Sequence, residues 1–163
     1  PLDPFYLTWK AKKVDYTTKF IELAGEINTA MPYYVVAKTV DALNARGVSI
    51  KGARVLVLGV AYKKDIDDQR ESPALKIISL LLERGAKVAY HDPYVPRSRG
   101  HREYPGLDLA SVPLGAARIK GADAVIIATG HSALDYAKIA RQARLVVDAR
   151  NAVKRRARNV IKA

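Results

Sequence analysis

The sequence contains no cysteine, so its 163 residues can form no disulfide and offer no thiol nucleophile. Its three histidines are far apart and lack the spacing of metal ligands, which makes a metal site improbable. No apolar run approaches the roughly 20 residues needed to span a bilayer. No signal peptide opens the chain either. We therefore expect a cytoplasmic protein with no membrane partner and no metal.

Acidic residues are scarce relative to basic ones, 16 against 28, which gives a formal net charge of +12. A surface of this kind favours anionic partners, among them nucleic acid, phosphorylated metabolites and acidic membranes. The basic residues are spread along the chain except for one cluster at its end, which comprises Arg150, Lys154, Arg155, Arg156, Arg158 and Lys162. We interpret this cluster as a solvated terminal helix or tail, with binding of a polyanion as the alternative.

An initiator methionine is also missing, and the chain opens on Pro-Leu-Asp-Pro. We expect a piece of a longer protein that has lost its amino-terminal part. Residues 1–50 have helical patterns. Asp3 is a good N-cap and Pro4 suits the first helical position, which predicts a short helix over 4–13.

A second helix is predicted over 18–45, where apolar residues recur every three or four positions. Pro32 falls inside this stripe and predicts either a kink or the start of a new helix. Gly47 ends the pattern. Such a long apolar stripe needs a cover, which a partner subunit or the missing part of the protein would supply.

Residues 51–163 alternate strands with helices, joined at one point by a long irregular loop over 93–107. The strands are apolar and rich in Val and Ile, as in a parallel sheet buried on both faces. Strands are predicted at 54–60, 87–91, 123–128 and 144–149, with a short fifth near 107–109, and helices at 73–84, 113–120 and 132–141. The predicted fold is α/β, a Rossmann-like three-layer sandwich with a mostly parallel sheet after a helical arm. The domains are then 1–50 and 51–163.

The most informative stretch is 59–73, in which a cation-bearing loop joins an apolar strand to a periodic helix. It lacks a full Gly-x-Gly-x-x-Gly pattern, so its glycines alone are a weak signal. In open α/β sheets, ligands bind outside the carboxyl ends of the strands, where the strand order reverses. If strands 54–60 and 123–128 are neighbours, segments 61–64, 129–131 and 148–151 converge at that edge.

These segments suit a nucleotide. The ring of Tyr62 can pack on a base or ribose, or else lie at the rim of the core, while Lys63 and Arg150 can meet a diphosphate. Lys64 is interpreted as an exposed loop lysine. Arg70 stands at a helix start, where a cation opposes the helix dipole, and this local conflict suggests a function.

Asp92 ends the second predicted strand, as does the acid that holds ribose hydroxyls in dinucleotide domains. Because Pro93 follows it, capping or turn formation explains this aspartate equally well. Both interpretations of Asp92 stay open at this point.

Taken together, the motifs resemble the carboxyl-terminal part of the UDP-glucose/GDP-mannose dehydrogenase family. Residues 1–11 resemble the segment after the catalytic cysteine of bacterial UDP-N-acetylhexosamine dehydrogenases, and 26–32 resemble their central dimerisation helix. Residues 58–65, followed by 70–73, are similar to the signature of the UDP-binding domain. Residues 147–151 resemble its last strand and a substrate-contacting arginine.

This resemblance implies oxidation of the C6 alcohol of a nucleotide sugar to a carboxylate, with NAD as cofactor. The family's cysteine would lie two positions before Pro1, and most NAD contacts would lie in an upstream domain, so the chain alone is expected to be inactive. The opening motif most resembles enzymes that act on UDP-N-acetylglucosamine. UDP-glucose and UDP-N-acetylmannosamine are the alternatives. The implied partners are a UDP-sugar and a second copy, joined partly through 18–46, with no nucleic acid.

The resemblance also implies roles for individual residues. Asp3 matches the aspartate that assists the water and hydride steps, a catalytic role. Tyr62 and Lys63 match contacts to the nucleotide sugar, and so does Arg150. Arg70 matches an arginine that reaches NAD. Leu2 stands where some members carry a lysine. The competing hypothesis is a freestanding module whose basic tail binds nucleic acid or another anion.

Overall fold

The structure, a computed structural model, describes residues 2–99 and 102–163, and their side chains from Pro4 onward. The catalytic role expected for Asp3 therefore falls on a side chain outside the described residues. The chain forms two compact units, Pro1–Pro32 and Tyr33–Ala163.

The first unit contains α1 (Leu2–Lys12) and the first part of α2 (Lys19–Asn44). A hydrogen bond of 2.8 Å between the hydroxyls of Thr18 and Thr8 joins the two helices, as does an ion pair of 2.9 Å between Lys12 and Glu22. The two predicted helices are confirmed within two residues at their ends.

Helix α2 continues through Pro32, so no new helix begins there and that alternative was wrong. Proline lacks the N–H that would donate to the preceding turn, which weakens a helix at this point. The residues after it compensate by packing. Val35 and Val36 are buried in the core of the second unit, and this burial holds the next turn in helical form.

The second unit is built on a sheet of five parallel strands in the order β2-β1-β5-β6-β7. Two further short strands form an antiparallel pair. The elements are β1 (Arg54–Leu58), α3 (Pro73–Glu83), β2 (Lys87–His91), β3 (Arg97–Ser98), β4 (Leu109–Ala110), α4 (Ala116–Gly121), β5 (Ala124–Ile127), α5 (Tyr136–Gln142), β6 (Val146–Asp148) and β7 (Val160–Lys162). The predicted α/β class and mostly parallel sheet are confirmed.

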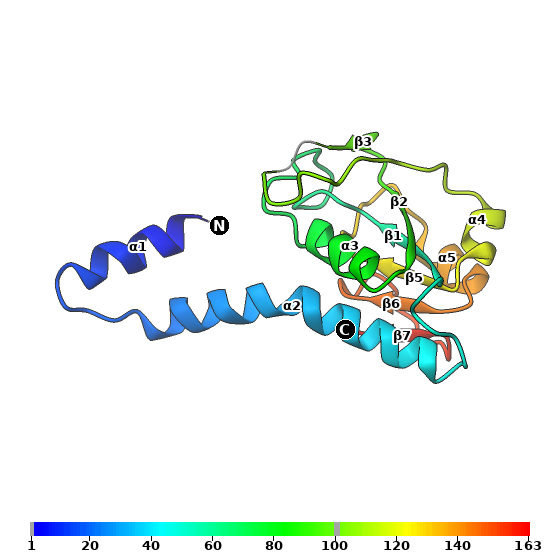
Figure 1. Cartoon of the computed structure of the whole chain (residues 1–163), viewed down its shortest axis with the longest axis horizontal. Coiled ribbons are helices and arrows are strands. Elements are labelled where there is room, and N and C mark those ends of the chain that lie inside the picture. The colour runs from blue at the N-terminus through cyan, green and yellow to red at the C-terminus, as the bar shows by residue number, and fades with distance from the viewer. Residues whose placement is uncertain (1, 100–101) are drawn as a thin grey trace. The chain divides into compact units, whose positions relative to one another are not determined.

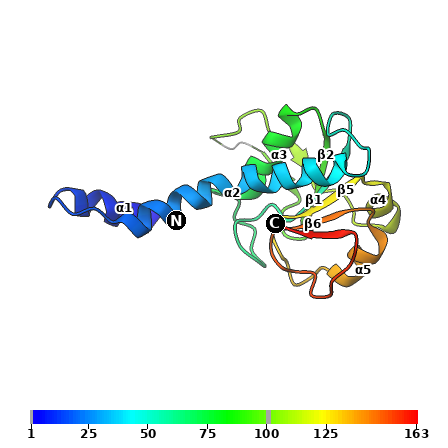
Figure 2. The ribbon, with the colours of Figure 1, turned by 90° about the horizontal axis from the view of Figure 1, so that it is seen from below.

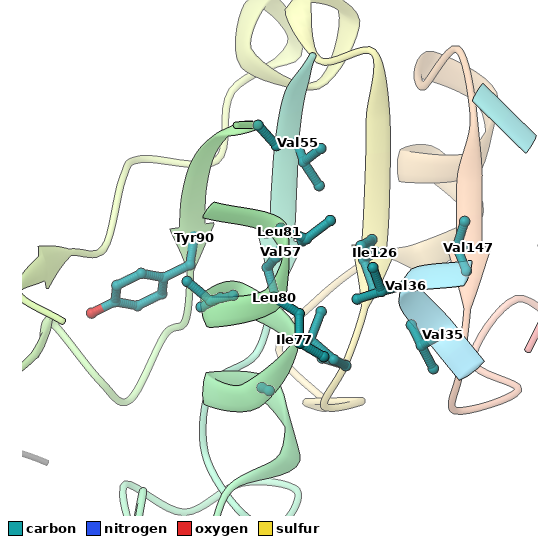
Figure 3. Packing of buried hydrophobic residues seen from close by; sticks show 14 of the residues in the cluster. Val35, Val36, Val55, Val57, Ile77, Leu80, Leu81, Tyr90, Ile126 and Val147 are labelled. Carbon is teal, nitrogen blue, oxygen red and sulfur yellow. The ribbon is translucent and has the colours of Figure 1, made fainter. Parts of the chain in front are cut away.

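Helices cover both faces of this sheet, which completes the three layers (Figure 1). On one face, α3 and the end of α2 pack against β1, β5 and β6. Figure 3 shows Leu81 of α3 and Val36 of α2 directed toward Val57 and Ile126 of the sheet. On the other face, α4 and α5 cover a second cluster, which includes Leu58 and residues from β5 and β6. The strands are therefore apolar on both sides, as their sequences predicted.

The basic cluster is solvated, as expected, but the terminus is neither a helix nor a free tail, because it ends in a strand. Val160 of β7 pairs in parallel with Val146 of β6 (Figure 2). The side-chain amide of Asn159 donates to two carbonyls near the end of α5, at 2.8 Å each. Val160 and Ile161 are half-buried. Charge dominates the local pattern of this segment, whereas pairing to β6 is a long-range contact that composition does not reveal.

Two other predictions need correction. Residues near 107–109 do contribute a strand, but β4 pairs with β3 in a separate two-stranded sheet instead of joining the main one. Helices α4 and α5 begin three to four residues later than predicted. The start of α5 is set by Asp135, whose carboxylate accepts a hydrogen bond of 2.9 Å from the amide of Lys138.

Candidate functional site

The strand order reverses between β1 and β5, because β2 lies on one side of β1 and β5 on the other. This is the switch point at which open α/β sheets bind ligands, outside the carboxyl ends of the strands. Two segments that start at this edge are important for the site. We call residues 61–72, after β1, the signature loop, and residues 149–159, between β6 and β7, the crossover.

Short hydrogen bonds join the three segments that were predicted to converge. The hydroxyl of Thr129 donates to the carbonyl of Ala61 at 2.6 Å. The Nε of Arg150 donates to the carbonyl of Ala128, also at 2.6 Å. Gly59 has a φ of +80°, and a Cβ there would lie 2.5 Å from the carbonyl oxygen of Thr129. Only glycine permits this approach, and the predicted convergence is confirmed.

Asp92 organises the backbone between these segments. Its side chain is fully buried. Its carboxylate accepts hydrogen bonds of 2.7 to 3.2 Å from four backbone amides, those of Val60, Ala61, Tyr94 and Val95. A carboxylate enclosed in this way has no face left for ribose hydroxyls. Of the two interpretations, turn formation is the one that the structure supports.

His131 adds a fifth hydrogen bond to Asp92. Its ring is fully buried, and its Nε2 lies 3.0 Å from the Oδ2 of Asp92. Its Nδ1 accepts a hydrogen bond of 3.0 Å from the backbone amide of Asp65, in the signature loop. The ring centroid of Tyr94 lies 5.1 Å away. His131 therefore links the signature loop to the end of β2.

Asp65 fixes the same loop from the opposite direction. Its carboxylate accepts two hydrogen bonds of 2.7 Å from Ser132, one from the amide and one from the hydroxyl. The side-chain hydrogen bond from Ser132 is the main reason that the pKa of Asp65 is lowered. With a φ of +61°, Asp65 adopts a conformation that few residues tolerate, and these hydrogen bonds hold it there.

Two predicted ligand residues lie in this loop. Lys63 is exposed and Tyr62 is half-buried, with the lysine ammonium 5.6 Å from the centroid of the tyrosine ring. The amide of Tyr62 donates to the carbonyl of Asp68 at 2.7 Å, which closes the loop on itself. The ammonium and one side of the ring can therefore meet a ligand from a backbone that is already ordered.

Arg70 lies at the end of the signature loop, just before the Ser72 N-cap of α3. Its guanidinium makes a bidentate pair with Asp68, at 3.0 Å through Nε and 2.7 Å through Nη2. These hydrogen bonds lower the pKa of Asp68 to about 2. The conflict with the dipole of α3 is thus reduced locally, which explains Arg70 without a ligand. A cofactor phosphate would compete with Asp68 for this guanidinium.

Arg150 begins the crossover, whose path is set by Asp148. The carboxylate of Asp148 is fully buried and accepts hydrogen bonds from three backbone amides, those of Arg150, Ala152 and Val153. The ammonium of Lys162 lies 2.5 Å from its Oδ2. Burial by itself would raise the pKa of Asp148, but Lys162 and the three amides outweigh it and lower that pKa. The side chain of Arg150 is exposed beyond its bond to Ala128.

Sequence reasoning placed Tyr62, Lys63 and Arg150 at this edge, and the structure brings their segments together. It offered turn formation for Asp92 but did not link Asp92 to His131 and Asp65, which belong to the same network. The signal that could have found this network was the polar residues that follow two strands, Asp92 after β2 and His131 soon after β5. Among the described residues, no group of three His, Asp or Glu lies close enough to hold a metal. No helix in that part of the chain is long and apolar enough to cross a membrane.

The fold and this edge define an open α/β domain of the nucleotide-binding class. The chain belongs to the UDP-glucose/GDP-mannose dehydrogenase family, since residues 56–155 match the UDP binding domain of that family. The resemblance drawn from the sequence motifs is thereby confirmed.

Individual relatives agree. The chain is 32% identical to UDP-N-acetyl-D-glucosamine 6-dehydrogenase of Pseudomonas aeruginosa, over 80% of this chain and 30% of that protein. It is 33% identical to UDP-N-acetyl-D-mannosamine dehydrogenase of Pyrococcus horikoshii, over 94% of this chain and 34% of that protein. The solved UDP-glucose dehydrogenase of Pyrobaculum islandicum matches with a TM-score of 0.73 and 30% identity, over 98% of this chain and 35% of that one. The chain thus spans about a third of these relatives.

Proposed function

We propose that this chain is the nucleotide-sugar-binding part and dimerisation arm of a cytoplasmic, NAD-dependent UDP-sugar 6-dehydrogenase, of the UDP-N-acetylglucosamine type. Such an enzyme oxidises the C6 alcohol to a carboxylate. The arm corresponds to 1–50 and the UDP-binding domain to 51–163. The observation that carries the proposal is the convergence, at the switch point of the sheet, of the segments that carry Lys63 and Arg150.

The chemistry of this edge suits a nucleoside diphosphate. Lysine and arginine form charge-assisted hydrogen bonds with phosphate, and the arginine can bind two oxygens at once. The ring of Tyr62 offers an apolar surface beside Lys63 for the base or ribose. The relatives act on UDP-sugars with different sugars, as their names state, so UDP-glucose and UDP-N-acetylmannosamine are the alternative substrates.

We assign only one residue of this chain to NAD binding. Arg70 is the one residue assigned to the cofactor, and its side chain is 88% exposed but paired with Asp68. Asp92 is enclosed and offers nothing to a ribose. We therefore assign most NAD contacts, together with the catalytic cysteine that Asp3 would assist, to a domain outside this sequence. The chain alone should produce no NADH from any UDP-sugar, which an absorbance assay with the purified protein would check.

Nucleotide binding is tested by calorimetric titration of UDP and UMP at fixed salt. We expect Lys63→Ala and Arg150→Ala each to weaken UDP binding about ten- to a hundredfold, because one charge-assisted bond is worth roughly 1.5–3 kcal/mol. UMP should be less affected, since it lacks the second phosphate. Lys64→Ala is the matched control, because Lys64 is an exposed neighbour whose ammonium lies 4.0 Å from Asp65. Unchanged UDP binding in both folded variants would refute the site.

Dimerisation rests on apolar side chains that stay exposed along the arm. Phe20 is 89% exposed, Leu23 51% and Ile27 53%, all on α2. Apolar surface on this scale is typical of an interface. We expect a homodimer or larger assembly in light scattering at micromolar concentration. Phe20→Glu should shift it toward monomer by at least tenfold in dissociation constant, whereas Lys19→Glu, which adds a negative charge next to it, should not.

A further inference from the structure

We propose that His131 is the positioning residue of the nucleotide-sugar site, and that it holds the signature loop in its binding conformation through the backbone amide of Asp65. This inference rests on the proposed function and assigns the residue that organises the same site. It starts from the geometry of one buried imidazole whose two ring nitrogens are both engaged, with partners of opposite kind.

The partners of His131 fix its chemical form. The backbone amide of Asp65 can only donate, so Nδ1 must be the unprotonated, accepting nitrogen. The Oδ2 of Asp92 already accepts from two backbone amides, so Nε2 must carry the hydrogen and donate to it. The neutral tautomer with its hydrogen on Nε2 satisfies both demands. If Nδ1 also carried a hydrogen, two donors would face each other, that hydrogen and the amide hydrogen of Asp65.

Two carboxylates face the ring, and the hydrogen bonds at its two nitrogens decide its form. Asp92 faces Nε2 from the end of β2, and a carboxylate oxygen of Asp65 lies 3.8 Å from Nδ1. The ring of Tyr94 packs against the imidazole, and the hydroxyl of Tyr136, on α5, donates to the carbonyl of His131 at 2.9 Å. Both the orientation of the ring and its backbone are therefore determined.

The consequence falls on Lys63. The signature loop is attached at three places: at the carbonyl of Ala61 by Thr129, at Asp65 by His131 and Ser132, and between Tyr62 and Asp68 by a backbone bond. Lys63 lies between the first two attachments. An ordered loop presents its cation without losing conformational freedom when the ligand binds, and such preorganisation appears as affinity. Removing His131 leaves Asp65 held by Ser132 alone, so part of that cost returns to the binding step.

Two measurements on the unmodified chain test the geometry. Nitrogen-15 NMR of the imidazole should show the hydrogen on Nε2 at neutral pH. The Asp65 amide should exchange with solvent much more slowly than the amide of Lys64, its neighbour in the same exposed loop. A hydrogen on Nδ1, or an Asp65 amide that exchanges as fast as that of Lys64, would overturn the proposal.

Three variants test the effect on binding. Gln carries one acceptor and one donor, so His131→Gln should keep UDP affinity within about threefold, whereas His131→Leu should lose at least tenfold, about 1.4 kcal/mol. In His131→Leu, hydrogen exchange should quicken in 61–72 and stay slow in β1. His91→Gln is the matched control, because the Nδ1 of His91 donates to a carbonyl, that of Val112, at 2.8 Å. It should bind UDP as the parent does.

Each outcome decides one of the two ideas. Parental UDP affinity in folded His131→Leu would overturn the positioning role, and so would an equal loss in His131→Leu and His91→Gln, which would indicate general stability alone. If His131→Leu does not fold, the tautomer, the exchange of the Asp65 amide and the His131→Gln variant still decide. If the parent does not bind UDP while the Asp65 amide is protected by His131, the attachment stands and the proposed function fails.

Discussion

Two loops leave the same edge of the sheet, and each is organised by one buried aspartate that accepts hydrogen bonds from several backbone amides. Asp92 holds the amides of Val60 and Ala61, which lead into the signature loop, and Asp148 holds the start of the crossover. Each loop carries one of the two cations proposed to meet the diphosphate. Asp92 accepts hydrogen bonds from four backbone amides and one side chain, and Asp148 from three backbone amides and one side chain. The two aspartates differ in the nature of that side chain.

Asp92 is completed by the imidazole of His131, whereas Asp148 is completed by the ammonium of Lys162. The first carboxylate is therefore stabilised by oriented dipoles, and the second partly by an opposite charge. A buried charge surrounded by dipoles depends on the geometry of its donors. One that pairs with a half-exposed lysine depends also on pH and on the charge of that lysine.

The largest effect is expected from Asp92→Asn. Whichever way the new amide turns, its NH₂ group faces at least two of the five donors, which leaves them without an acceptor. Each buried unsatisfied donor costs about 1–3 kcal/mol, so the free energy of unfolding should fall by about 4 kcal/mol. Urea denaturation followed by circular dichroism measures it. A loss below about 1 kcal/mol would show that the hydrogen bonds to Asp92 do not hold these backbone segments in place.

Asp148→Asn should cost less, about 2–3 kcal/mol, although it removes the same charge. The new NH₂ group can take the Oδ2 position, where one of the two donors that it faces is Lys162, whose side chain is 49% exposed and can turn to water. The same denaturation series gives the value. If Asp148→Asn proved more costly than Asp92→Asn, charge compensation would outweigh the number of amides, and the comparison would be reversed.

Stability should also depend on acid pH through Asp148. Its folded pKa is lowered from 3.8, so the stability it contributes is present above about pH 4 and is lost as the pH falls through the folded pKa. Other carboxylates are lowered as well, including Asp65 and Asp123, so the parent alone is not informative. The difference in unfolding free energy between the parent and Asp148→Asn should shrink between pH 5 and about pH 2. A constant difference would contradict the assignment.

The smallest effect is expected from Lys162→Met, which keeps most of the side-chain volume and removes the ammonium. Because the side chain is half exposed, we expect the free energy of unfolding to fall by about 1 kcal/mol. Hydrogen exchange should become faster in β7 and stay unchanged in the signature loop. Lys154→Met, in the exposed part of the crossover, is the control and should leave unfolding unchanged. Altered exchange in 61–72 would show that the two loops are coupled.

The sequence was sufficient for whatever depends on neighbours along the chain. Four apolar runs rich in Val and Ile predicted four of the five strands in the main sheet, and the helix predicted from residue 73 begins there. The motif around Lys63 and the arginine after the strand at 146–148 led to the edge of the sheet and to the family. These features succeed because burial periodicity, capping and loop chemistry are local.

Only the tertiary structure decided how that edge is held together. Asp92 and His131 are 39 residues apart, and Asp65 and His131 are 66 apart, so no pattern along the chain connects them. The tertiary fold also turned the basic terminus into a strand, because Val160 and Ile161 gain pairing with β6 and Lys162 neutralises Asp148. The physical reason is the same in each case. A buried polar group must find its partner in space, and where that partner lies is set by strand order, which local sequence does not encode.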